Sequence, residues 1–504
     1  MRTLVVLWDP ENPLVPVGSI VDALKSRPDV RVSLLSFEQL GHPTLPNGAF
    51  ELRRALGDHI PDVLLWVEGG PLPGDLGNLP CRKACWLVNT HLEPSLLEDL
   101  GGAFDVVFSA SLEDTGTIWL PLASAGLGAP PPGLSVLMDD PKPPHHAEIE
   151  DLLSQEAHDL GPLPVPLVVV LGNGGRVHPA LYDCLRSGAA VVTDPDSDLR
   201  GLAHASEHLE TYPSHEELGD FLRTLARDRK RLSQLSARGP EIVRHLHEPE
   251  MRADTLVRGL WPAYEVLSGA EHHSRISILV TCFRYLRRFR VCLESFARQE
   301  LPPGSLEIVV ADPESPDGLA EALRSFAGRY PALRVVRLPL DPRYHRNRGV
   351  GINRAFDASI GQVVIGIDGD LVFPPGLIGT LADRVLAAPD RVFGIRRSFV
   401  GREDTERILG GQLDPFENFE SLSQSSGDGE SGAFVGVLGY CQAVRREAFA
   451  RARYPEEFDA VNQSDIVFVE RLKKWAGVTP QYLHEESALH LWHPRNWKGT
   501  DEDL

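Results

Sequence analysis

Short apolar runs of strand length alternate with amphipathic stretches of helix length along most of this 504-residue chain. Strands that are apolar on both faces and are joined by helices form parallel sheets covered by helices. The sequence therefore predicts an α/β fold. The runs expected to be strands are 3–8, 31–36, 63–67, 84–88, 105–109, 165–171 and 189–193, and then, in a series that starts afresh, 276–280, 306–310, 333–337 and 362–367.

The chain is too long for one hydrophobic core, so we expect several domains. A Pro-rich stretch at 129–144 divides the first series of strands, and a helical segment from 216 to about 266 closes it. The small, polar segment 268–275 then resembles a linker. We expect Rossmann-like lobes at 1–128 and 129–267, the second of them shortened, the linker at 268–275, and a further domain at 276–504.

Composition narrows the classes of partner. The formal net charge is −21, most of it in the first 275 residues, and no basic stripe is present, which argues against nucleic acid and anionic membrane. No apolar run approaches the roughly 20 residues of a membrane-spanning helix, and Asp9 comes too early for a secretory signal. The six cysteines are scattered without a zinc-binding spacing, so we expect core thiols and a cytoplasmic protein.

Asp368-Gly369-Asp370 directly follows the expected strand 362–367 and precedes the apolar run 371–373. Two carboxylates one residue apart at the end of a strand point the same way, and the glycine between them lets a ligand approach the backbone. Such a pair suits a hard divalent cation shared with a diphosphate. In a plain loop, the same three residues would more often be a solvated turn.

Three further motifs accompany this one in order. Residues 292–299 read Cys-Leu-Glu-Ser-Phe-Ala-Arg-Gln, residues 307–317 read Glu-Ile-Val-Val-Ala-Asp-Pro-Glu-Ser-Pro-Asp, and residues 346–349 read Arg-Asn-Arg-Gly. Together they resemble the GT-A glycosyltransferases of family 2, over 276 to about 499. The resemblance implies a nucleotide-diphospho-sugar transferase domain with a bound Mn2+ or Mg2+.

The resemblance also implies a donor site. Thr281 and Phe283 follow the first strand of this domain, where the family binds the nucleotide. Asp312 stands where the family's aspartate accepts the ring N–H of uracil, unless it only caps a turn. Arg346 stands where a forked donor would meet the diphosphate, unless it pairs with a helix carboxylate.

For the metal, the resemblance points to Asp370 as a direct ligand and to Asp368 as a partner of ribose or of metal-bound water. Residues 488–494 read Ala-Leu-His-Leu-Trp-His-Pro and are similar to the C-terminal histidine motif of GT-A enzymes that act on UDP-sugars. An imidazole there can complete a manganese shell. We favour His490 over His493, and a structural role for either histidine stays open.

Asp465 precedes the expected helix 466–475 and falls on the aspartate of the family's Glu-Asp motif, which deprotonates the acceptor. Ser464 replaces the motif's glutamate, which puts recognition of the acceptor in question. The alternative for Asp465 is a plain helix N-cap.

These features predict a metal-dependent, inverting glycosyltransferase that moves a sugar from a nucleotide-diphosphate donor, a UDP-sugar by resemblance, to a hydroxyl of a glycan or glycoconjugate. A sugar nucleotidylyltransferase is disfavoured because 281–285 lacks the glycine-rich loop that such enzymes need. A non-catalytic carbohydrate-binding protein is disfavoured because Asp312, Asp370 and Asp465 are all present. The sequence does not define the sugar, the acceptor or the oligomeric state.

The first 265 residues resemble the CgeB-like group of GT-B glycosyltransferases, through Trp-Leu-Pro-Leu-Ala at 119–123 and the segment 183–194. Asp183 stands where that group has a ribose-binding glutamate. The turn 172–175, Gly-Asn-Gly-Gly, could hold a phosphate or be only a tight turn. Because 123–165 is Pro-rich and poor in strand signals, we expect a degenerate lobe that serves as a scaffold or acceptor platform. The alternative is a bifunctional enzyme with a second active GT-B site.

Overall fold

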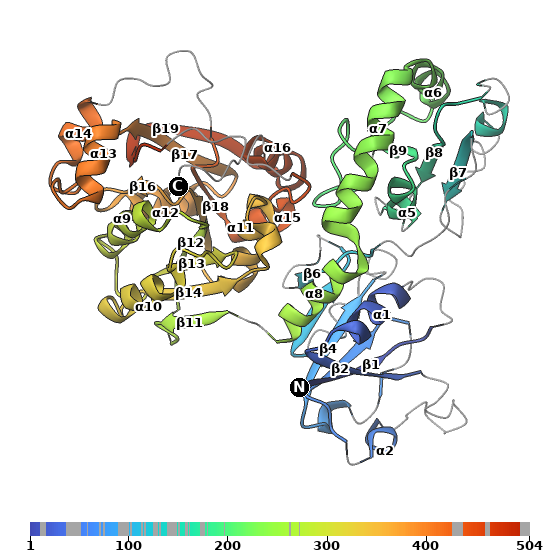
Figure 1. The fold of residues 1–504 in the computed structure, drawn as a ribbon, viewed down its shortest axis with the longest axis horizontal. Helices are drawn as coiled ribbons and strands as arrows, with labels where there is room; N and C mark the ends of the chain where they lie inside the picture. Colours follow the sequence, from blue (N-terminus) through green and yellow to red (C-terminus); the bar gives the residue numbers. More distant parts are fainter. Residues whose placement is uncertain are drawn as a thin grey trace. The chain divides into compact units, whose positions relative to one another are not determined.

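The structure is a computed structural model that divides into two compact units, Met1–Pro262 and Ala263–Leu504. Each unit has its own sheets and core (Figure 1). The described residues are 1–10, 17–36, 52–57, 59–69, 72–73, 76–88, 100, 103–111, 114, 117–123, 130, 133–138, 149, 152–156, 160, 162–171, 177–178, 180–195, 197–261, 264–271, 273–425, 437–458 and 464–493.

The first unit begins with a six-stranded parallel sheet in the order β2-β1-β3-β4-β5-β6. Its strand β3 is wholly buried, and β4 is buried over its last four residues, as their apolar runs require. Its elements are β1 (Arg2–Leu7), α1 (Gly18–Ser26), β2 (Val30–Leu35), α2 (Leu52–Leu56), β3 (Val63–Val67), η1 (Leu76–Asn78), β4 (Arg82–Leu87), β5 (Val106–Ser109) and β6 (Ile118–Trp119).

A second parallel sheet in this unit has the order β10-β9-β8-β7. The strand β7 lies within 123–165, the stretch in which the sequence shows few strand signals. Its run Leu-Ser-Val-Leu-Met is short and stands between prolines, which hid it. The elements are β7 (Leu134–Met138), β8 (Leu167–Leu171), α5 (Ala180–Arg186), β9 (Ala190–Thr193), β10 (Glu210–Thr211), α6 (Leu218–Arg227), α7 (Arg229–Ile242), the π-helix η2 (Val243–His247) and α8 (Pro249–Leu260).

The last helix of the unit, α8, returns to the first sheet and packs on α1. Arg27 Nη1 lies 3.4 Å from Asp254 Oδ1, and Arg82 Nη1 donates to the carbonyl of Leu260 at 2.7 Å. The two sheets of the first unit are thus joined by packing as well as by the chain.

The second unit contains one nine-stranded sheet in the order β11-β14-β13-β12-β15-β18-β17-β19-β16. Strands β14, β13, β12 and β15 are parallel, whereas β18 runs antiparallel to β15. The strands are β11 (Glu265–Ser268), β12 (Ile276–Thr281), β13 (Leu306–Asp312), β14 (Arg334–Pro339), β15 (Val363–Ile367), β16 (Leu371–Val372), β17 (Arg391–Phe399), β18 (Cys441–Arg445) and β19 (Thr479–His490).

Helices cover both faces of this sheet (Figure 1). Successive residues of β12 show why: Ile278 and Val280 pack against α9, α10 and α12, whereas Leu279 belongs to the core beneath α11, α15 and α16. The helices are α9 (Leu286–Ala297), α10 (Leu319–Arg329), η3 (Pro342–Tyr344), α11 (Arg348–Ala358), α12 (Leu377–Ala387), α13 (Arg402–Leu409), α14 (Phe419–Ser425), α15 (Arg446–Ala452) and α16 (Ser464–Ala476).

The strand β11 lies where we expected the end of a helix and the start of a linker. We expected helix up to about 266, but Glu265–Ser268 pairs antiparallel with β14 and so lies in the sheet of the second unit. Val266 and Leu267 pack against the cores on its two faces, which explains why a strand forms there. The structure thus confirms the α/β class, with Rossmann-like sheets first and a GT-A-like sheet second.

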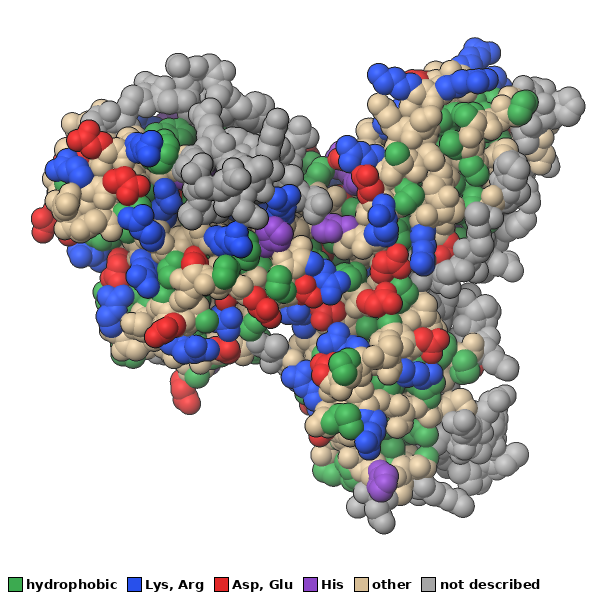
Figure 2. Space-filling model, viewed as in Figure 1, with side chains coloured by type: hydrophobic (Ala, Val, Ile, Leu, Met, Phe, Trp, Pro, Cys, Tyr) green, Lys and Arg blue, Asp and Glu red, His purple; other side chains and the backbone are tan. Residues whose placement is uncertain are grey.

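Two further observations concern the surface. No helix among the described residues is long and apolar enough to cross a membrane. On the face shown in Figure 2, Lys and Arg side chains are interspersed with Asp and Glu over both units.

Candidate functional site

The carboxyl ends of the central parallel strands carry most of the residues that the sequence singled out. Thr281 ends β12, Asp312 ends β13, and Asp368 follows β15. Because these strands are parallel neighbours, their ends meet at one edge of the sheet, the edge at which α/β folds bind ligands.

Asp370, His490 and His493 gather at this edge. Their nitrogen and carboxylate oxygen atoms lie within 4.8 Å of one another. The Nε2 atom of His490 is 3.2 Å from Asp370 Oδ2, and that of His493 is 3.4 Å from the same oxygen. Both histidines therefore approach the predicted metal ligand, with His490 buried and His493 partly exposed.

The register of two short strands sets this arrangement. Leu371 of β16 pairs with His490 of β19, and the N–H of Leu491 donates to the carbonyl of Asp370 at 3.0 Å. The chain after His490 is held by Arg288, whose Nε donates to the carbonyl of Trp492 at 2.9 Å. The ends of two segments more than 100 residues apart are thus fixed side by side.

The charge of Asp370 is sustained by its neighbours. Burial alone would raise its pKa, but His490 and His493 lower the pKa overall to about 2. The hydroxyl of Tyr285 donates to Asp370 Oδ2 at 3.1 Å, and burial together with that carboxylate raises the pKa of Tyr285. At neutral pH the site therefore contains a carboxylate and a phenol that stays protonated.

Two buried atoms of the Asp370–His490–His493 cluster lack a hydrogen-bond partner among the described residues: Asp370 Oδ1 and His490 Nδ1. A buried polar atom without a partner costs free energy, so in native proteins such atoms usually have a ligand or water. One carboxylate and two imidazoles form a donor set that can hold a divalent first-row transition metal. The residues present thus fit a divalent cation.

Asp312 is only 1% exposed and is held by two partners. Its Oδ1 accepts the N–H of Ser315 at 2.7 Å, and its Oδ2 lies 2.7 Å from Arg337 Nη2. The turn-capping interpretation is thus part of its role. Arg337 Nε also donates to Oδ2 at 2.8 Å, so that oxygen accepts two hydrogen bonds, whereas Oδ1 accepts one and keeps a lone pair for a ligand.

Thr281 and Phe283 flank the same edge. The methyl group of Thr281 lies where a Cβ on Gly351 of α11 would be, only 2.1 Å away, so the glycine permits this close packing. The ring of Phe283 lies 4.9 Å from that of His345, measured between centroids.

Arg346 and Arg348 differ in position. Arg346 is exposed just before α11, whereas the guanidinium of Arg348 is largely buried and forms an ion pair with Asp368. Burial would lower the pKa of Arg348, but Asp368, Tyr454 and Asp465 raise it overall. Reasoning from the sequence missed Arg348. The sequence signal that could have identified Arg348 is its position as the first helical residue after the N-cap Asn347. That position directs its side chain toward the sheet edge.

Asp368 and Asp370 do not share partners, although their spacing predicted that they point the same way. The strand β15 ends at Ile367 and a turn follows, so strand alternation no longer applies. The side chain of Asp368 is 36% exposed and faces Arg348, whereas that of Asp370 is 4% exposed and faces the histidines.

Asp465 lies in the first turn of α16. Its Oδ2 accepts the N–H of Gly439 at 2.8 Å, and its Oδ1 accepts the N–H of Ile466 at 3.0 Å. The bond to Ile466 joins neighbouring residues inside the helix, whereas an N-cap accepts from two or three residues on, and the bond to Gly439 comes from another segment. The residues 459–463 of the same motif lie outside the described residues.

Residues 277–452 match the family model of glycosyl transferase family 2. Within the second unit, this segment is similar to the family 2 glycosyl transferases. This match confirms the resemblance drawn from residues 292–299, 307–317 and 346–349. No curated protein matches the chain.

Similar solved structures include the mannosyltransferase PcManGT from Pyrobaculum calidifontis in complex with GDP-Man and Mn2+, with 20% identity over 47% of this chain and 63% of that one, at a TM-score of 0.32. TarS 1–349 of S. aureus in complex with UDP has 15% identity over 44% of this chain and 61% of that one, at a TM-score of 0.31. In both cases the chain covers less than two thirds of the other protein.

Residues 163–258 of the first unit match a second model, described as glycosyl transferase-like. Asp183 lies within α5 and is 3% exposed, and the turn 172–175 lies outside the described residues. The glycosyltransferase-like character expected of this unit is thus confirmed, and its activity stays a prediction.

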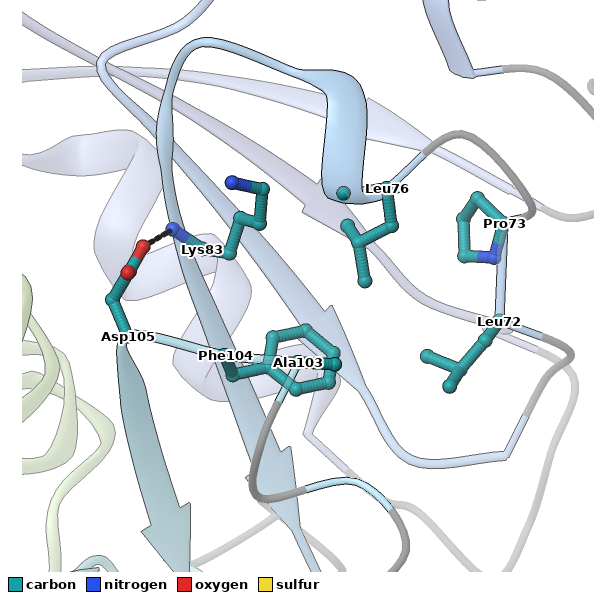
Figure 3. A pocket seen from close by; sticks show the side chains of 8 residues that line it. Leu72, Pro73, Leu76, Lys83, Ala103, Phe104 and Asp105 are labelled. Carbon is teal, nitrogen blue, oxygen red and sulfur yellow. Dashed lines mark hydrogen bonds between the residues drawn. The ribbon is translucent and has the colours of Figure 1, made fainter.

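The first unit also has a cavity of about 470 Å3 (Figure 3). It is lined by Leu76, Phe104 and neighbouring residues, and the backbone N–H of Lys83 donates to Asp105 Oδ2 at 2.7 Å beside it. Lys83 is the second residue of β4, and Asp105 precedes β5. The cavity is thus at the amino ends of these strands, away from the carboxyl edge where such sheets bind ligands.

Proposed function

We propose that the second unit is a metal-dependent, inverting glycosyltransferase that transfers a sugar from a nucleotide-diphosphate donor, a UDP-sugar in the first instance, to a hydroxyl of a glycan or glycoconjugate. The observation that carries this proposal is the Asp370–His490–His493 cluster at the carboxyl edge of a family 2 glycosyltransferase sheet.

The residues at the carboxyl edge of the sheet have different roles. Asp370, His490 and His493 would hold Mn2+ or Mg2+, which neutralises the charge that builds on the leaving nucleoside diphosphate. Asp312 would accept the uracil N–H, and Thr281 and Phe283 would line the nucleotide. Tyr285 orients Asp370 through its hydroxyl.

Asp465 would take the proton of the acceptor hydroxyl as that oxygen attacks the anomeric carbon. Its carboxylate is held by two backbone N–H groups that fix its direction. Attack from the face opposite to the departing diphosphate inverts the configuration at the anomeric carbon.

The stereochemistry tests the mechanism. The full-length protein is incubated with UDP-sugars, manganese and water as the acceptor, and the anomeric protons of the released sugar are followed by NMR before they equilibrate. We expect the β-sugar from an α-linked donor, and initial release of the α-sugar would contradict an inverting reaction.

For the first unit we propose a non-catalytic scaffold or acceptor platform. The alternative, a second active GT-B site, is favoured by the glycosyl transferase-like match at 163–258. Nucleotide binding by a variant without the Asp370 site distinguishes the two, as argued in the Discussion.

A further inference from the structure

Arg348 connects three segments of the proposed active site. Its Nη1 forms an ion pair with Asp368 Oδ1, and its Nη2 donates to the carbonyl of Gly439 at 2.5 Å. Its guanidinium carbon also lies 5.7 Å from the centre of the Tyr454 ring. The side chain of Arg348 is 9% exposed, so these contacts are shielded from solvent.

The backbone of Gly439 links Arg348 to Asp465. Its carbonyl accepts from Arg348, and its own N–H donates to Asp465 Oδ2 at 2.8 Å. A Cβ on Gly439 would lie 2.8 Å from the Cβ of Asp465, so the backbone approaches the carboxylate as closely as a glycine permits. A continuous chain of polar contacts therefore runs from Asp368 through Arg348 and Gly439 to Asp465.

The segment around Gly439 is also bound to the strand end directly. The N–H of Asp368 donates to the carbonyl of Tyr440 at 3.1 Å. With Arg348 beside it, the 439–440 backbone has little freedom to move relative to Asp368. These contacts thus fix the position of Asp465 relative to the same strand end that carries Asp370.

We propose that Arg348 is a positioning residue that sets the acceptor base Asp465 relative to the donor edge through the backbone of Gly439. The inference rests on the proposed function and extends it, since the diphosphate-binding role was expected of Arg346. A forked guanidinium is suited to this task, because one group can satisfy a carboxylate and a carbonyl at once. A lysine offers the charge without the fork.

A double-mutant cycle tests the inference in the full-length protein. Arg348→Gln, Asp465→Asn and the double variant are compared for UDP-sugar turnover with manganese. We expect Arg348→Gln to lower kcat about 100-fold, the order of loss that a small displacement of a reacting group causes. If Arg348 acts through Asp465, the double variant loses little more than Asp465→Asn alone. Losses that multiply would overturn the proposal.

Binding of UDP with manganese separates positioning from direct contact. We expect Arg348→Gln to bind UDP as the unchanged protein does, and Arg348→Lys to recover only part of kcat. A tenfold loss of UDP affinity with kcat preserved would make Arg348 a ligand of the diphosphate and overturn the proposal. Arg343→Gln is the matched control, because Arg343 is exposed and pairs with Asp341 on the same approach to α11.

A second variant tests the contact between Gly439 and Asp465 directly. Gly439→Ala places a methyl group against Asp465 while leaving Arg348 intact, and we expect a similar loss of kcat with unchanged UDP binding. Wild-type turnover in Gly439→Ala would contradict the inference.

Amide hydrogen exchange provides a readout that needs no turnover. The peptide that contains Gly439 should exchange faster in Arg348→Gln than in the unchanged protein, because the bond to Asp465 loosens. If the unchanged protein transferred no sugar, the proposed function would fail, and this exchange would still decide the positioning. An unchanged exchange rate of the Gly439 peptide in Arg348→Gln would overturn the positioning role of Arg348.

Discussion

At the scale of single residues, the site separates two carboxylates that look alike in the sequence. Asp368 and Asp370 are one residue apart, yet a turn directs one toward Arg348 and the other toward two histidines. Their spacing predicted a shared direction because it assumed that β15 continues. Long-range contacts with segments near residues 348 and 490 decide where each points, and no local pattern contains those contacts.

The two histidines of the cluster should differ in their contribution. His490 is buried and lies nearer to Asp370 than His493, which is 30% exposed. We expect His490→Ala to weaken manganese binding at least tenfold, and His493→Ala to weaken it less. Manganese titration followed by electron paramagnetic resonance measures both. Equal losses would mean that both rings bind the metal alike.

At the scale of elements, most strands and helices could be predicted because hydrophobic periodicity is local. The strands β3, β12 and β15 lie within two residues of their expected bounds. The short strand β7 and the strand β11 could not be recognised, because each is stabilised by pairing with a distant strand. The place of Asp465 at the start of a helix could be predicted from the sequence, whereas the partners of Arg348 could not.

The contact of α11 with the segment before α16 makes an element-scale prediction. A Cβ on Gly349 would lie 1.9 Å from the carbonyl oxygen of Pro455, and Asn347 Nδ2 donates to the Glu456 carbonyl at 2.7 Å. Gly349→Ala should therefore destabilise the second unit by about 3 kcal/mol or more, because backbone cannot yield as a side chain does.

Urea unfolding with spectroscopic detection measures that loss. Gly328→Ala is the control, because a Cβ there, also inside a helix, would meet nothing within 4 Å. It should stabilise the unit slightly, by roughly 0.4–1 kcal/mol. Equal stability of the two variants would contradict the close contact at Gly349.

At the scale of the whole molecule, the chain combines a segment that matches glycosyl transferase family 2 with a segment that matches a glycosyl transferase-like model. Composition and motif order were sufficient to predict both classes. What the first unit does could not be predicted, since its phosphate-binding candidate is a short glycine-rich turn that many non-binding proteins share.

The scaffold role of the first unit predicts one binding site for nucleotide-sugars. In the full-length Asp370→Ala protein, UDP-sugars should no longer raise the melting temperature, with or without manganese. A remaining shift that is then lost on Asp183→Asn would instead identify a second donor site in the first unit.

The stability of the first unit should depend on pH because of a buried histidine. Burial, with the nearby His204 and Arg238, lowers the pKa of His208 to about 4 from the usual 6.5. Between these values the unfolded chain binds more protons than the folded one, so stability is lost as the pH falls through this range, by about 3 kcal/mol at most.

Calorimetric unfolding between pH 7 and pH 4 measures this loss. His208→Asn keeps an acceptor for the N–H of His204, which bonds to His208 Nδ1 at 3.1 Å, and should reduce the pH dependence of the first unit's transition. An unchanged dependence would assign the effect to other groups.

The central claim is that Asp370 forms part of a divalent-metal site for sugar transfer. Release of nucleoside diphosphate from a panel of nucleotide-sugars, with manganese, magnesium or a chelator, tests it most directly in the unchanged protein and in Asp370→Ala. We predict release from at least one donor that requires the metal and disappears in the variant, while both proteins unfold with equal cooperativity. Release that persists in Asp370→Ala, or that is indifferent to the chelator, would contradict the claim.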